Sequence, residues 1–104
     1  MNNSSLLVNM HTEGVTGAVG RVLGIKLKDK IISDFNSQEY DKIILDFSKV
    51  EFVTSGFAKE LFGGLYSAFN TNFKQVVSVR VDKENEALKS TIVRALATVI
   101  GQQQ

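Results

Sequence analysis

The sequence predicts an α/β fold of element order β-α-β-α-β-α, with a mainly parallel or mixed sheet and helices packed on it. Three observations predict it: three short apolar runs that suit strands, three longer segments with apolar residues at helical spacing, and the alternation of the two. Strands that alternate with helices form βαβ units with right-handed crossovers. The 104 residues match the commonest size of one domain, so we expect a single domain over 1–104, with disordered ends at 1–4 and 102–104.

The first strand and helix are expected near 5–10 and 17–35. Residues 6–10 form a short apolar run that suits a buried strand. After a stretch punctuated by glycines, apolar residues recur at helical spacing: Ala18, Val19, Val22, Leu23, Leu27, Ile31 and Phe35. Asn36 is expected to end this helix, because asparagine tolerates the left-handed conformation of a helix stop.

The second strand and helix are expected near 42–47 and 55–69. Ile43, Ile44 and Leu45 are consecutive aliphatic residues, which is typical of a strand that is covered on both faces. The helix has its own apolar stripe, and Asn70 is expected to end it: Phe57, Leu61, Leu65, Ala68 and Phe69. This strand is therefore predicted to lie inside the sheet, with helices on both sides.

The third strand and helix are expected near 75–81 and 84–100. Four valines between 76 and 81 favour a strand. The helical stripe consists of Leu88, Ile92, Ala95, Leu96 and Val99. Glu84 and Glu86 come early and Lys89 and Arg94 later, an order that suits the helix dipole. Gly101 is expected to end the helix.

Composition excludes several classes of function. Twelve Lys and Arg against eleven Asp and Glu give a net charge of +1, too balanced for a nucleic-acid partner. The chain has no cysteine and one histidine, His11, so we expect no disulfide, no conventional metal site and no cofactor. Its start lacks the basic residues of a signal peptide, and no stretch approaches the roughly 18 apolar residues of a membrane span. We therefore expect a cytoplasmic protein without membrane contact, and the sequence leaves its oligomeric state open.

Residues 46–56 hold the first group of candidate functional side chains. They follow a predicted strand, and loops beyond the carboxyl ends of strands are where sites gather in α/β sheets. Thr54 and Ser55 precede the second helical stripe, where a hydroxyl can cap the free N–H groups of the helix. The alternative is phosphorylation, because a helix N-terminus also accommodates a phosphate. Asp46 is expected to be structural, accepting hydrogen bonds from backbone N–H groups of the following loop.

The same region carries a resemblance to a known family. Residues 43–57 read IILDFSKVEFVTSGF, and 57–63 continue as FAKELFG. This pattern resembles the STAS domain of anti-sigma-factor antagonists. It is more similar to the bacterial STAS-like families of unknown function, which share DFS-x-V-x-F, small hydroxyl residues and then F-A-x-E-L-F-G. The resemblance is good over 43–63 and loose over 15–100.

The resemblance implies a regulatory module that docks a protein partner. In the antagonists, the hydroxyl just before the glycine is phosphorylated by a serine kinase that doubles as an anti-sigma factor. Ser55 matches that position, with Thr54 as the second candidate, although Val53 stands where the antagonists carry an aspartate. The implied partner is a kinase of the histidine-kinase ATPase superfamily or another anti-sigma-type protein. The docking surface would comprise Val50, Phe52, Thr54, Ser55, Gly56 and Lys59.

Two other classes of function remain open. The Gly14–Gly20 loop could bind a small ligand or a nucleotide with the help of Arg21, although its spacing matches neither G-x-G-x-x-G nor the P-loop. A hydrolase built on Ser55 would need G-x-S-x-G, but Val53 replaces the first glycine. His11, the lone histidine, is more typical of a loop residue than of a general base. We therefore expect the chain not to be an enzyme.

Overall fold

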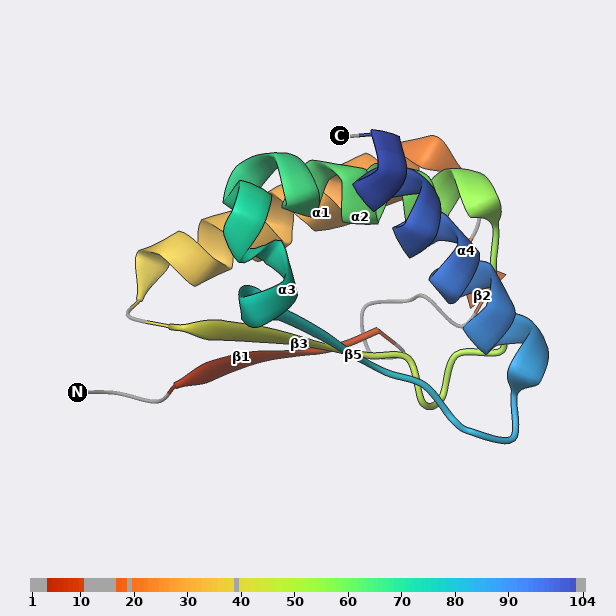
Figure 1. Ribbon diagram of the computed structural model, residues 1–104. Coiled ribbons are helices and arrows are strands. Elements are labelled where there is room, and N and C mark those ends of the chain that lie inside the picture. Colours follow the sequence, from red (N-terminus) through yellow and green to blue (C-terminus); the bar gives the residue numbers. More distant parts are fainter. Residues whose placement is uncertain (1–3, 11–16, 19, 39, 103–104) are drawn as a thin grey trace.

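Three parallel strands form the main sheet, in the order β1-β3-β5 (Figure 1). The strands are β1 (Ser5–Asn9), β3 (Lys42–Asp46) and β5 (Val77–Arg80). The structure is a computed structural model that describes residues 4–10, 17–18, 20–38 and 40–102. Leu7 pairs with Ile44, and Ile44 pairs with Ser78, so β3 is central as predicted.

Three long helices lie together above one face of this sheet (Figure 1). They are α1 (Arg21–Ser37), α2 (Ser55–Phe69) and α4 (Glu86–Gln102), and α2 packs against both of the others. Two very short strands, β2 (Gly17–Ala18) and β4 (Phe52–Val53), form a separate parallel pair. A 3-10 turn, η1 (Asn70–Asn72), and a one-turn helix, α3 (Phe73–Val76), lead into β5. No helix in the described part of the chain combines the length and apolar character that a membrane crossing needs.

The expectation that β3 is covered on both faces is wrong. Ile43 and Leu45 are fully buried beneath the helices, whereas Ile44 points to the other face and Leu7 beside it is 55% exposed. The strand order explains this: successive right-handed crossovers that advance in one direction place their helices on the same side. A doubly wound sheet needs a reversal of strand order, and the order β1-β3-β5 has none.

The hydrophobic core therefore lies in one layer between sheet and helices. The strands contribute alternate residues to it, and the helices contribute their apolar stripes. The largest fully buried side chains are Phe47, Phe57, Phe62, Met10, Ile31, Ile43, Leu45, Leu61, Leu65 and Leu88.

The ends of the three long helices can be compared with the ends that the sequence predicted. Asn70 ends α2 with φ of 53°, in the positive range expected of such a stop. The first helix begins only at Arg21, because Gly17–Ala18 belong to β2 and Gly20 has φ of 94°. It also runs one residue past Asn36. The last helix likewise runs one residue past Gly101, since α4 includes Gln102, and a glycine near a helix end costs only about 1 kcal/mol.

Candidate functional site

The candidate site occupies the end of the molecule where the main strands have their carboxyl ends. The N-termini of α1, α2 and α4 all lie at this end, on the right of Figure 1, together with β2. Each helix N-terminus carries a partial positive charge and N–H groups that the helix itself leaves unpaired. The fold thus concentrates hydrogen-bond donors at one end of the molecule.

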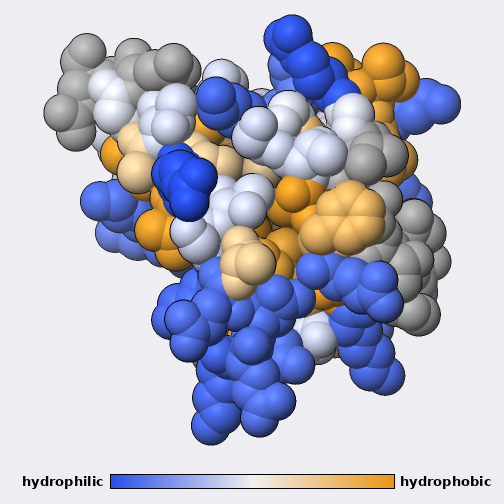
Figure 2. Space-filling view, turned by 90° about the vertical axis from the view of Figure 1, so that its right-hand side faces the viewer, coloured by the Kyte–Doolittle hydropathy of each residue, from blue (hydrophilic) through white to orange (hydrophobic). Residues whose placement is uncertain are grey.

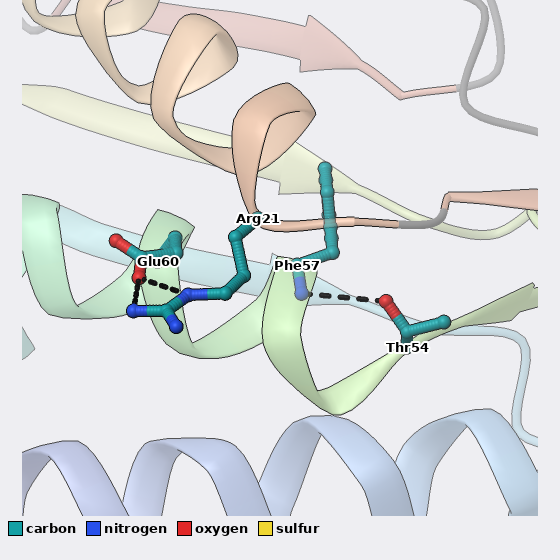
Figure 3. Close-up of polar contacts among 4 residues, drawn as sticks. All are labelled: Arg21, Thr54, Phe57 and Glu60. Carbon is teal, nitrogen blue, oxygen red and sulfur yellow. Dashed lines mark hydrogen bonds and ion pairs between the residues drawn. The ribbon is translucent and has the colours of Figure 1, made fainter.

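Thr54 is the residue that organises this end. It is the N-cap of α2, and its Oγ1 accepts a hydrogen bond of 3.3 Å from Phe57 N (Figure 3). The same oxygen accepts a second bond, of 3.1 Å, from Gly20 N just before α1. One hydroxyl therefore joins the N-termini of two helices that are 34 residues apart in sequence.

An ion pair links the same two helices. Arg21 of α1 approaches Glu60 of α2 with Nη2 at 2.8 Å and Nε at 2.9 Å from Oε2 (Figure 3). The Arg21 side chain also covers Gly56, where an added Cβ would lie 3.1 Å from Arg21 Cγ. Arg21, which the ligand-binding alternative assigned to an anion, is thus already engaged by a carboxylate.

Ser55 follows the cap and has no comparable structural role. It occupies the first position of α2, its side chain is exposed, and no hydrogen bond to its hydroxyl is formed within the described residues. It lines a half-open groove of about 350 Å³ between α2 and α4. Two cationic side chains and two further hydroxyls line the groove as well: Lys59, Arg94, Thr91 and Thr98.

Asp46 lies at the end of β3, on the sheet face that the helices leave open. Its Oδ1 accepts a hydrogen bond of 2.9 Å from Ser48 N, the contact with the following loop that the sequence predicted. The Ser48 side-chain and backbone hydrogen bonds lower the pKa of Asp46. Its ionised form therefore stabilises the fold above the unfolded pKa of about 3.9, and this stabilisation disappears as pH falls through the lowered pKa.

The residues predicted to contact a partner are only partly brought together at the surface. Phe52, Ser55 and Lys59 are exposed, with Phe52 at 49%, whereas Thr54 and Gly56 are half-buried. The assignment of Val50 to the docking surface is wrong: it is 3% exposed and belongs to the core. The turn after β3, closed by a hydrogen bond of 3.0 Å from Val50 N to Phe47 O, directs this side chain inward.

The Gly14–Gly20 loop lies largely outside the described residues. Of its members, Gly17 and Ala18 form β2, with Gly17 paired to Phe52 and Ala18 to Val53. Gly20 N donates to Thr54, as described above. His11 also lies outside the described residues.

Sequence reasoning missed Asn85, which anchors α4 to the site. Its Oδ1 accepts a hydrogen bond of 3.1 Å from Leu88 N, as an N-cap does, and its Nδ2 donates to Glu51 O at 3.0 Å. The available signal was an asparagine three residues before the first apolar residue of the helical stripe. The bond to Glu51 could not be read from sequence, because it spans 34 positions.

The surface of this end mixes apolar and polar side chains. Figure 2 faces it and shows hydrophobic areas in the centre of the view, bordered by hydrophilic ones. Phe52 and Val22, at 49% and 68% exposure, are large apolar side chains of β4 and of the first turn of α1. Among the described residues, no cluster of His, Cys, Asp or Glu is arranged to hold a metal ion.

Comparison with known proteins places the chain in a family. Residues 24–85, more than half of the chain, match the family model described as "STAS-like domain of unknown function (DUF4325)". No curated protein and no solved structure matches the chain significantly. The matched range runs from α1 to the residue before α4 and includes Thr54, Ser55 and the Glu60 partner of Arg21. The chain therefore belongs to the family of STAS-like domains.

Proposed function

We propose that this STAS-like domain is a non-catalytic regulatory module that docks a protein partner, and that phosphorylation of Ser55 controls the docking. One observation carries the proposal: Thr54 caps α2, while the adjacent Ser55 is exposed and makes no hydrogen bond through its hydroxyl within the described residues. A structural explanation accounts for Thr54 but leaves Ser55 without a role. An exposed hydroxyl at the start of a helix is accessible to a kinase.

The electrostatics around Ser55 favour a phosphoryl group at this position. The first turn of α2 offers backbone N–H groups and the positive end of the helix dipole. Lys59 lies one turn further along the same helix, and Arg94 lines the groove from α4. A phosphate of about two negative charges would therefore be stabilised without unfolding the helix.

The family resemblance supplies the kind of partner. Ser55 matches the hydroxyl that a serine kinase phosphorylates in the anti-sigma-factor antagonists. The partner that we propose for this domain is therefore a cytoplasmic kinase of the histidine-kinase ATPase superfamily. Phe52, Ser55 and Lys59 provide the exposed contacts. A phosphate on Ser55 would release the partner, because removing about two added negative charges from water at an interface costs several kcal/mol.

The test measures binding of the chain to a purified serine kinase of the histidine-kinase ATPase superfamily. Ser55→Asp is expected to weaken binding at least about tenfold, which corresponds to about 1.4 kcal/mol, and Ser55→Ala to bind like the wild type. Ser67→Asp is the matched control, since Ser67 is also an exposed serine of α2 but lies near its other end. Equal binding by Ser55→Asp and the wild type would contradict the phosphorylation switch. Loss of binding in Ser67→Asp as well would point to a general effect of added charge.

A further inference from the structure

Within the described part of the chain, no strand pairs with the far edge of β5. Among the described residues β5 pairs only with β3, and Phe47 N donates to Arg80 O at 2.8 Å on that side. In an extended strand the backbone groups of successive residues point to opposite sides, so those of Val79 and Val81 point away from β3. An edge of this kind is a template for strand pairing.

An apolar groove lies alongside this edge, between β5 and α4. Its volume is about 320 Å³, and five apolar side chains line it: Val79, Val81, Ile92, Val93 and Leu96. Val93 is 54% exposed, so an apolar side chain at the rim of this groove is accessible to a partner. A strand added to β5 would lie beneath α4 and direct every second side chain into the groove.

Two lysines lie at the rim of the groove and define its charge. Lys83 and Lys89 both line it, and neither forms an ion pair with a carboxylate of the described residues. Glu86 lines a neighbouring hollow with the same two lysines, so the net charge of the three side chains is positive. The surface is therefore complementary to a segment that carries both apolar and acidic side chains.

We propose that β5 and α4 form a second docking site, which binds an extended segment of a partner protein by strand addition. The segment alternates apolar residues, which enter the groove, with residues that face away from it, and its acidic residues contact Lys83 and Lys89. The groove beside Ser55 is lined by other residues of α4, namely Thr91, Arg94, Ala95 and Thr98. The second site is therefore independent of the proposed phosphorylation of Ser55.

Selection from a displayed library of short random peptides tests this site with the whole chain as the target. Enriched peptides are expected to alternate apolar and other residues and to include Asp or Glu. Val93→Asp is expected to weaken their binding at least about tenfold, and the double variant Lys83→Glu with Lys89→Glu to do the same. Val22→Asp, a matched change of an exposed valine on α1, should leave binding unchanged. In the complex, amide exchange at Val79 and Val81 should slow, as strand pairing requires.

Three results would overturn the proposal. One is a selection that enriches no peptide, or that enriches only peptides whose affinity for the Val93→Asp variant equals their affinity for the wild type. Another is slowed exchange confined to α4, which would indicate a bound helix. The third is concentration-dependent self-association that Val93→Asp abolishes, which would assign the groove to a second copy of this chain. Ser55→Asp should bind the selected peptides like the wild type, so failure here is distinguishable from failure of the phosphorylation switch.

Discussion

Thr54 and Ser55 are neighbouring hydroxyl residues with different roles. The Thr54 hydroxyl accepts from Phe57 N and Gly20 N, and so serves α2 and the start of α1 together. Ser55 is one residue further along, already inside the helix, and its side chain points to solvent. The sequence allowed either residue to be the cap, and the structure separates the cap from the candidate phosphorylation site.

This division predicts different stability losses for two alanine substitutions. Thr54→Ala should lower the free energy of unfolding by about 1 to 2 kcal/mol, because it leaves two backbone N–H groups without their acceptor. Ser55→Ala should change it by less than about 0.5 kcal/mol, since no hydrogen bond is lost. Urea denaturation of both variants measures the difference. Thr54→Ser retains the hydroxyl and should therefore keep most of the wild-type stability. Equal losses of unfolding free energy in Thr54→Ala and Ser55→Ala would contradict the assignment of Thr54 as the cap.

At the scale of elements, the close approach of α1 and α2 builds the site. Gly24 is the residue that permits it, because an added Cβ would lie 2.7 Å from Phe57 O and 3.1 Å from Glu60 Cβ. A backbone oxygen on a buried helix cannot move aside as a flexible side chain does. The same approach brings Arg21 to Glu60 and Gly20 to Thr54.

Two glycine substitutions test this helix contact. Gly24→Ala should destabilise the fold by about 1 kcal/mol or more, because the steric conflict exceeds the gain of roughly 1 kcal/mol in helix propensity. Gly101→Ala is the matched control in α4, where an added Cβ meets nothing within 4 Å. It should leave the melting temperature unchanged or raise it slightly. A Gly24→Ala variant that is more stable than the wild type would show that α1 and α2 leave room for a Cβ at this position.

At the scale of the whole molecule, the described residues cover the sheet on one face only. The strand order β1-β3-β5 sends both crossovers to the same side, and all three long helices follow. The open face carries Leu7, Ile44 and Ser78 in one row across the three strands. A parallel sheet with an open face is uncommon, since such sheets are usually covered on both sides.

Substitutions on the two faces of the sheet should differ strongly in effect. Leu45→Ala removes a fully buried side chain beneath the helices and should cost about 2 to 5 kcal/mol. Leu7→Ala alters a side chain that is 55% exposed, and should cost less than about 1 kcal/mol. Denaturant midpoints of the isolated chain compare the two. Similar losses at both positions would mean that the second face is also buried.

The sequence by itself determined the order and kind of the main elements. All three strands and all three long helices lie close to their predicted positions, and α2 runs over 55–69 as predicted. The stop at Asn70 and the contact of Asp46 with the following loop were also predictable. These features were accessible because they depend on short-range patterns: the period of apolar residues, the capping preference and a side chain that bonds to its own loop.

Only the tertiary structure decided which face of the sheet is covered, which hydroxyl is the cap and where Val50 points. The three consecutive aliphatic residues of β3 did not reveal that Ile44 faces away from the helices. Which face of the sheet the helices cover depends on whether each new strand is added on the same side of the sheet as the one before, and the sequence does not show this. The pairing of β2 with β4, the bond from Gly20 to Thr54 and the bond from Asn85 to Glu51 all join residues more than thirty positions apart. Local periodicity carries no information about such contacts, since they are set by how the helices and the sheet pack together.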